Sequence, residues 1–325
     1  MIVPQFWAEG RAQHKEPGRQ VTVRRFGWSD LSEEDAQANA NDRANEALQR
    51  VLAGDNLARR EPKVSYNGAD GVPIREEIVS RHGDAVITRN SYGALCLNTP
   101  DVLFVDVDFT RLPPTRLTFT LGVILFAMSM AFAINERHFG LFVLGCVLSA
   151  VGSLLLSAWL FRGYELLAGG SSRRAMRRIR SFSARNPGWN LCVYETPAGF
   201  RVLMMHDVFD PSATQVADCF RQLGADPVYA RMCLRQHCFR ARISPKPWRI
   251  GLSSPLRPRP GVWPVKAEHL PKRLQWIHLY EEKSAAFASC RHVGQFGSSV
   301  THPAAEAVRK IHDEMSRAFS GLPLA

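Results

Sequence analysis

Two long apolar runs in the middle of the chain limit its possible folds more than any other feature. Leu117 to Ile134 contains 18 residues and Phe139 to Phe161 contains 23, and neither run holds a charged residue. As helices they would rise roughly 27 Å and 34 Å, against a hydrocarbon core about 30 Å thick. A buried hairpin of a soluble protein is the alternative, but core helices seldom stay apolar on every face. The sequence predicts a two-helix transmembrane hairpin within residues 111–165.

Arginines flank this hairpin unequally. Arg111 and Arg116 precede the first run and six arginines occupy residues 162–180, whereas the connection contains only Arg137. The positive-inside rule therefore predicts that both termini are cytoplasmic. Because neither run contains Asp, Glu, Lys, Arg or His, the hairpin is expected to be an anchor and not a channel.

Small residues recur at every fourth position of the second run. They are Gly145, Ser149, Ser153 and Ser157. This spacing places them on one helix face, where a second helix can approach closely. That helix can be the first run or a second copy of the chain, so a homo-oligomer is one expectation.

The segments on either side, residues 1–110 and 166–325, have the patterns of soluble structure. Hydrophobic periodicity and turn residues predict helices at 28–55, 75–81, 172–184, 213–223 and 228–236, and strands at 85–88, 93–97, 102–109, 189–196, 200–206 and 239–243. Without the hairpin and one extra helix, the order from residue 102 onward is strand, helix, strand, strand, helix, strand. This is the split βαβ order, so we predict an α+β, ferredoxin-like cytoplasmic domain interrupted by the hairpin.

The strand predicted at 102–109 carries two aspartates, Asp106 and Asp108. Side chains alternate along a strand, so both carboxylates should project from one face, roughly 6 to 7 Å apart. Two carboxylates so placed can share a divalent cation, and Mg²⁺ or Mn²⁺ is expected where phosphates are handled. The alternative is a pair of solvated aspartates at the end of a strand.

Downstream residues extend this pattern. A turn leads through Gly199 and Arg201 to His206, and the basic stretch FRARISPKPWRI follows. Together with the Asp-x-Asp strand, residues 100–250 resemble the palm of archaeo-eukaryotic primases. In that family the aspartates bind metal ions and the strand histidine contacts the phosphates of the incoming nucleotide. The resemblance implies metal ligands at Asp106 and Asp108 and a catalytic role for His206, while a third carboxylate is not identified.

The chain as a whole resembles a family of uncharacterised bacterial transmembrane proteins. The similarity lies in stretches such as VTVRRFGWSDLS and ITRNSYGALCLNTPDVLFVDVDF. It implies a bacterial inner-membrane location and brings no known activity with it.

Positive charge is concentrated after the first soluble segment. Of a formal charge of +11, residues 1–110 contribute 13 Lys/Arg against 17 Asp/Glu, and the remainder contributes 28 against 13. Between Asp226 and Glu268 there are nine cations and no acid, interleaved with aromatic residues such as Trp248. Such a mixture can hold phosphates and stack bases, although a plain basic surface is the alternative. The candidate phosphate-binding residues are Arg201, Arg240, Arg242, Lys246 and Arg249.

A second basic stretch follows the hairpin. Leu166 to Tyr194 contains no acid, and its arginines are expected to meet anionic lipid headgroups, at about 1 kcal/mol each. The candidates are Arg173, Arg174, Arg177, Arg178 and Arg180. Two functions stay open: a metal-dependent site for nucleotide or nucleic acid, and a non-catalytic anchored module that binds anionic lipid, nucleic acid or a partner protein. Walker, GxGxxG and GxSxG motifs do not occur in the chain.

Overall fold

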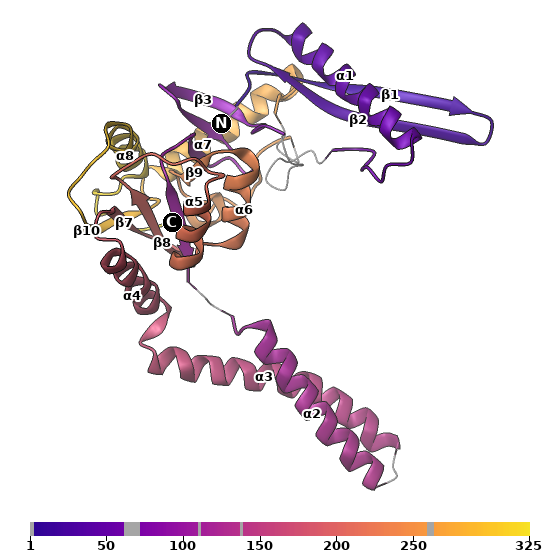
Figure 1. Cartoon of the computed structure of the whole chain (residues 1–325), viewed down its shortest axis with the longest axis vertical. Helices are drawn as coiled ribbons and strands as arrows, with labels where there is room; N and C mark the ends of the chain where they lie inside the picture. The colour runs from indigo at the N-terminus through magenta and orange to yellow at the C-terminus, as the bar shows by residue number, and fades with distance from the viewer. Residues whose placement is uncertain (1–2, 62–71, 110–111, 137–138, 259–262) are drawn as a thin grey trace. The chain divides into compact units, whose positions relative to one another are not determined.

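The computed structural model describes residues 3–61, 72–109, 112–136, 139–258 and 263–325 (Figure 1). The chain is a mixed α+β protein that forms two compact units. One combines Met1–Val107 with Ser183–Ala325, and the other is Asp108–Phe182. Residues 62–71 and the arginines Arg111, Arg137 and Arg259 lie outside the described residues.

The N-terminal part is a β-hairpin covered by a helix (Figure 1). Strands β1 (Phe6–Glu16) and β2 (Arg19–Ser29) pair antiparallel, and α1 (Glu33–Leu52) follows. The predicted helix is confirmed, and Ser32 caps its start, since its hydroxyl accepts from the Asp35 N–H at 3.0 Å. It begins after Trp28 because that residue pairs within β2. A Cβ at Gly27 would lie 2.1 Å from Ala40 N, so glycine lets α1 approach the hairpin.

One four-stranded antiparallel sheet has the order β3-β4-β5-β9. Its members are β3 (Glu77–His82), β4 (Ala85–Arg89), β5 (Leu95–Thr99) and β9 (Phe239–Arg242). The helix predicted at 75–81 is wrong, because most of this stretch is β3. Residues Gly83 and Asp84 form a two-residue connection that pairs β3 with β4, and Gly83 adopts φ +58°.

A second four-stranded sheet has the order β10-β7-β8-β6. It contains β6 (Phe104–Asp108), β7 (Asn190–Thr196), β8 (Gly199–Met204) and β10 (Arg291–Gly297). The predicted strands at 102–109, 189–196 and 200–206 are thus neighbours. The predicted fourth strand, β9, pairs instead with β5 in the other sheet, and β10 extends this sheet beside β7.

Helices complete this unit. They are α5 (Thr214–Leu223), α6 (Pro227–Gln236), α7 (Leu270–Ser284) and α8 (Pro303–Ser316), with short 3-10 turns η2 (Pro247–Ile250) and η3 (Ala267–His269). The start of α6 covers the edge of β6: the Asp226 N–H donates to the Asp106 carbonyl at 3.0 Å. The Tyr229 hydroxyl donates to the Phe104 carbonyl at 2.9 Å. These bonds fix the strand that carries Asp106.

The other unit is a helical hairpin of α2 (Thr115–Asn135) and α3 (Phe139–Leu167), followed by α4 (Gly170–Arg185), of which residues up to Phe182 belong to it. Both α2 and α3 are long and apolar enough to cross a membrane. Only 6% and 17% of the residues in their most apolar windows are buried, whereas a helix from a soluble core would be mostly buried. This exposure supports association with a membrane.

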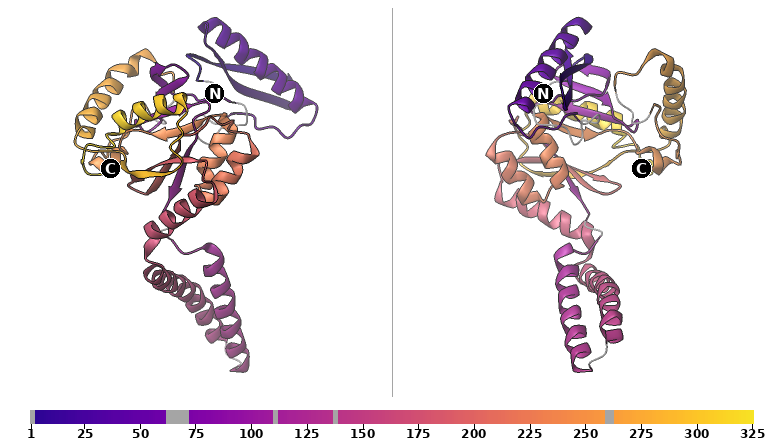
Figure 2. Two further views of the ribbon diagram at one scale, coloured as in Figure 1. Left: turned by 60° about the vertical axis from the view of Figure 1, so that its left-hand side comes forward. Right: turned by 90° about the vertical axis from the view of Figure 1, so that its right-hand side faces the viewer.

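The stripe of small residues in α3 packs on α2, which runs beside it (Figure 2). Ser149 and Ser129 share a hydrogen bond of 3.1 Å between their hydroxyls, and the Thr118 hydroxyl donates to Ser157 at 3.0 Å. A Cβ at Gly145 would lie 2.7 Å from the Ser129 Cβ. The prediction of a packed face is confirmed, and its partner is the first helix of the same chain.

Candidate ligand-binding site

The first aspartate of the Asp-x-Asp strand is held by a buried arginine. In β8, Arg201 donates from Nε to Asp106 Oδ1 at 2.8 Å and from Nη2 to Oδ2 at 3.1 Å. Only 3% of the Arg201 side chain is exposed, compared with 28% of the Asp106 side chain. Burial alone would lower the pKa of Arg201, but the charge and hydrogen bonds of Asp106 outweigh it and raise the pKa. The pair is therefore a charged bidentate fork between β6 and β8.

Asp108 and His206 lie elsewhere. Asp108 is the exposed last residue of β6. The His206 ring lies against Trp189 and Phe209, with ring centroids 4.7 Å and 5.5 Å away. Burial lowers the pKa of His206, and the charge of Asp207 opposes this only in part.

These positions do not fit a cation held by Asp106. Both oxygens of the Asp106 carboxylate already accept from Arg201, whose positive charge would repel a metal ion at the same place. Within the described part of the chain, no group of three His, Cys, Asp or Glu residues is arranged to hold a metal ion. The Mg²⁺ or Mn²⁺ site at Asp106 and Asp108 stays a prediction from the sequence.

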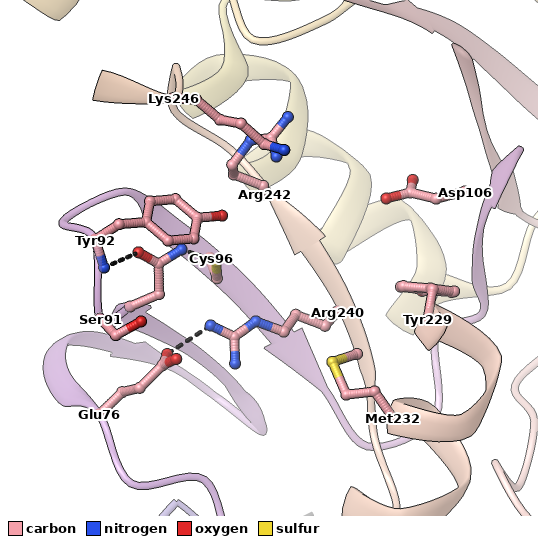
Figure 3. Close-up of a pocket in the computed structure, with 11 residues that line it drawn as sticks. Glu76, Ser91, Tyr92, Cys96, Asp106, Tyr229, Met232, Arg240, Arg242 and Lys246 are labelled. Carbon is pink, nitrogen blue, oxygen red and sulfur yellow. Dashed lines mark hydrogen bonds and ion pairs between the residues drawn. The ribbon is translucent and has the colours of Figure 1, made fainter. Parts of the chain in front are cut away.

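Asp106 instead lines a cavity of about 400 Å³ in the α+β unit (Figure 3). Residues of the β4–β5 turn, of β6, of α6 and of β9 surround it. The lining residues are Glu76, Asn90, Ser91, Tyr92, Cys96, Asp106, Tyr229, Met232, Arg240, Arg242 and Lys246. Neither Asp108 nor His206 is among them.

A second buried ion pair closes another part of the cavity. Arg240 of β9 donates to Glu76 at 2.5 Å (Figure 3). The hydroxyl of Thr88 donates to the same carboxylate at 2.6 Å. Only 7% of the Arg240 side chain is exposed. Burial would lower the pKa of Arg240, but nearby groups, Glu76 among them, raise it well above its usual value. Each carboxylate among the described lining residues is thus already paired with an arginine.

The remaining cations of the cavity, Arg242 and Lys246, lie beside aromatic rings. Lys246 Nζ is 5.4 Å from the centroid of the Trp248 ring, and Trp248 meets Tyr92 edge-on at 5.3 Å. Burial raises the pKa of Tyr92, and Arg242 opposes this as charge and hydrogen-bond partner. The buried Arg242 Nε has no hydrogen-bond partner among the described residues. A buried donor of this kind is normally satisfied by water or a ligand.

The other predicted basic residues have separate places. Arg249 belongs to η2 and does not line this cavity. Arg173, Arg177, Arg178 and Arg180 are exposed on α4, while Arg174 is half-buried beside Glu165. The structure therefore brings four predicted residues to one site: Asp106, Arg240, Arg242 and Lys246 line the cavity, and Arg201 holds Asp106 from behind.

Sequence reasoning missed the opposite wall of the cavity, formed by Glu76 and by Asn90 to Tyr92. The turn Asn90-Ser91-Tyr92-Gly93 between two apolar strands is a visible signal of a connecting loop. What placed it at the site is the pairing of β5 with β9, which sets Cys96 opposite Arg242. That register joins segments almost 150 residues apart, and no local pattern indicates it.

No protein-family model, curated protein or solved structure matches the chain. The fold and site define an α+β protein with two helices suited to a membrane and a cavity lined by arginine, lysine and tyrosine.

Proposed function

We propose that this chain is a membrane-anchored protein whose α+β unit binds a nucleotide in the cavity beside Arg242 and Lys246. The phosphates would lie against these two cations. The base would stack on the aromatic pair of Tyr92 and Trp248. The arrangement supports binding and does not by itself supply a catalytic step.

The charge balance of the site carries this proposal. The two lining carboxylates, Asp106 and Glu76, are neutralised by direct ion pairs with Arg201 and Arg240. Arg242, whose buried Nε has no hydrogen-bond partner among the described residues, also lines the cavity together with Lys246, and this suits an anion. Arginine and lysine placed beside aromatic rings form the combination that holds phosphates and stacks bases.

The dimensions agree with a ligand of this class. A cavity of about 400 Å³ falls in the range of roughly 300 to 1,000 Å³ that small-molecule sites occupy. Trp248, which contacts Tyr92 and Lys246, is 57% exposed and offers a ring face that a base can cover. A bare phosphate would use the cations and leave the rings uncovered.

The proposal also covers the fold of the α+β unit and the location of the protein in the cell. The order β7-β8-β6 supports a ferredoxin-like sheet that lacks its fourth strand, because β9 pairs with β5 in a second sheet and β10 extends the opposite edge beside β7. The arginines around the hairpin support an anchor in a bacterial inner membrane with both termini cytoplasmic. A reporter fused after Ala325 should report cytoplasm, and a periplasmic signal would refute this orientation.

The binding proposal is tested by calorimetric titration of ATP into the detergent-solubilised full chain. Arg242→Gln should weaken binding about 10- to 150-fold, because a hydrogen bond to a charged group is worth about 1.5–3 kcal/mol. Trp248→Ala should weaken it about 5- to 150-fold, the range for losing one stacked base. Inorganic triphosphate should lose affinity in the first variant and not in the second.

Arg221→Gln is the matched control, since Arg221 is an exposed arginine of α5 that does not line this cavity. Equal affinities for wild type, Arg242→Gln and Arg221→Gln would refute the proposed site. Binding should persist when Mg²⁺ and Mn²⁺ are chelated. An absolute requirement for the metal would favour the metal-dependent palm that the sequence predicted. If no nucleotide binds, the result would favour the alternative function, a non-catalytic module that binds lipid or a partner protein.

A further inference from the structure

The end of α3 extends beyond the thickness of a membrane. The helix has 29 residues and would rise roughly 44 Å, against a hydrocarbon core of about 30 Å. Its last turns carry Trp159 and Tyr164, which are 70% and 57% exposed. Exposed tryptophan and tyrosine are enriched at the interface between lipid and water. If α3 spans the bilayer, these turns lie at the level of the lipid headgroups.

α4 begins immediately after this end. Gly169 and Gly170 adopt φ of +77° and +86°, values that break the helical path between α3 and α4. Within α4 the buried residues Ala175, Ile179 and Phe182 follow one another at intervals of four and three residues. They mark one side of the helix as the packed side.

Three arginines occupy the opposite side of α4. At about 100° per residue, Arg173, Arg177 and Arg180 fall within a narrow sector that faces away from the packed side. All three residues are exposed. We call these three residues the arginine stripe.

Contacts at the junction set the direction of the stripe relative to α3. Arg177 donates to the Ala168 carbonyl at 2.6 Å, which ties α4 to the end of α3. Arg174 forms an ion pair with Glu165, and its guanidinium lies 4.9 Å from the centroid of the Tyr164 ring. From Leu166 to Tyr194 the sequence contains no acid.

We propose that the arginine stripe binds the phosphate groups of anionic lipids in the leaflet that the end of α3 reaches. The inference rests on the membrane-spanning hairpin and is independent of what the cavity binds. A lipid fits better than a soluble anion because the stripe begins six residues after Leu167, beside the interfacial aromatic residues of α3. Each arginine near a charged membrane surface should favour an anionic lipid about fivefold.

The experiment measures which lipids stay with the protein. The full chain is reconstituted in vesicles of phosphatidylcholine with phosphatidylglycerol and extracted in a mild neutral detergent. Retained lipids are then counted by mass spectrometry. Wild type should retain phosphatidylglycerol above its share of the vesicle, and high salt during extraction should reduce this enrichment. Replacing the stripe with Arg173→Gln, Arg177→Gln and Arg180→Gln should abolish it.

Two further variants separate the stripe from general effects of charge. Replacing the same three positions with lysine keeps the charge and should keep most of the enrichment. The triple change Arg11→Gln, Arg221→Gln and Arg231→Gln removes the same charge from exposed positions outside the hairpin unit and should leave enrichment unchanged. Equal thermal unfolding midpoints would show that the variants are folded.

The possible results test lipid binding by the arginine stripe separately from the membrane-spanning hairpin on which it rests. Retention of the chain in vesicles without enrichment, or equal loss in the stripe variant and the control, would overturn the arginine stripe as a lipid site. Release of wild type from vesicles by alkaline carbonate would overturn the spanning hairpin and this inference with it. Neither result would change nucleotide binding in the cavity.

Discussion

Asp106→Asn tests the central geometric finding, because it removes one charge from the Asp106–Arg201 pair and keeps the shape of the side chain. Arg201 donates to both oxygens of the carboxylate. An asparagine offers one oxygen and turns two N–H donors toward the guanidinium. Water cannot readily replace the lost acceptor, since Arg201 is only 2% exposed.

The expected cost follows from the burial of the two partners. Removing one member of a buried ion pair costs about 3–5 kcal/mol, because the other charge stays buried without its counter-ion. The Asp106 side chain is 28% exposed, so the lower end of this range, about 3 kcal/mol, applies. A solvated aspartate at the end of a strand would instead change stability by less than about 0.5 kcal/mol.

Thermal unfolding of the full chain in neutral detergent distinguishes these cases. For a unit of this size, about 3 kcal/mol should lower the unfolding midpoint by roughly 6 to 12 °C. Asp42→Asn, at an exposed position of α1, is the matched control and should have little effect. The double variant Asp106→Leu with Arg201→Met should recover part of the loss, since it leaves no buried charge. A midpoint for Asp106→Asn no lower than that of the control would refute the structural role of the pair.

Two further predictions concern His206 and the helical hairpin. Because burial lowers the pKa of His206 below its ordinary value of 6.5, its contribution to stability is present above that value and lost as pH falls toward the lowered pKa. His206→Gln should therefore reduce the difference in unfolding free energy between about pH 7 and pH 5, measured by urea titration, and an unchanged difference would contradict this. In the hairpin, Gly145→Leu should lower the yield of an oxidative cross-link between Ser129→Cys and Ser149→Cys, because a Cβ at Gly145 already lies 2.7 Å from Ser129. Gly163→Leu is the control in the same helix, since a Cβ there meets no atom within 4 Å, and equal yields would refute close packing at Gly145.

Elements with local signals could be predicted from the sequence. Short stretches of sequence are enough to indicate the apolar runs of α2 and α3, the Ser32 cap of α1 and the strands β6, β7 and β8. β10 gives no such signal, because its sequence RHVGQFG alternates without an apolar face and contains two glycines. It is a strand because it pairs with β7. Tertiary pairing, not propensity, decided this element.

Only part of the cavity lining could be predicted from the sequence, again because tertiary pairing decides the rest. Arg240, Arg242 and Lys246 were selected because positive charge clusters along the sequence there. Glu76 and Tyr92, which face them, come from a segment far away in the chain and become neighbours only through the β5–β9 pairing. The run of positive charge in the sequence therefore indicates the wall with the arginines and Lys246. The wall with Glu76 and Tyr92 depends on the register between β5 and β9.

The role of the Asp-x-Asp strand is constrained by its neighbour β8. Every residue of Gly199 to Met204 is buried, including Arg201, and an ionised side chain inside such a strand must find a counter-ion. In the structure the neighbour of β8 is β6, and the acid of β6 that meets Arg201 is Asp106. An aspartate already paired in this way is unsuited to a cation, and Arg240 pairs with Glu76 by the same logic. With both carboxylates paired, the buried Nε of Arg242 still has no hydrogen-bond partner among the described residues. The pairing that argues against a metal site is therefore also the basis of our proposal that the cavity binds a phosphate.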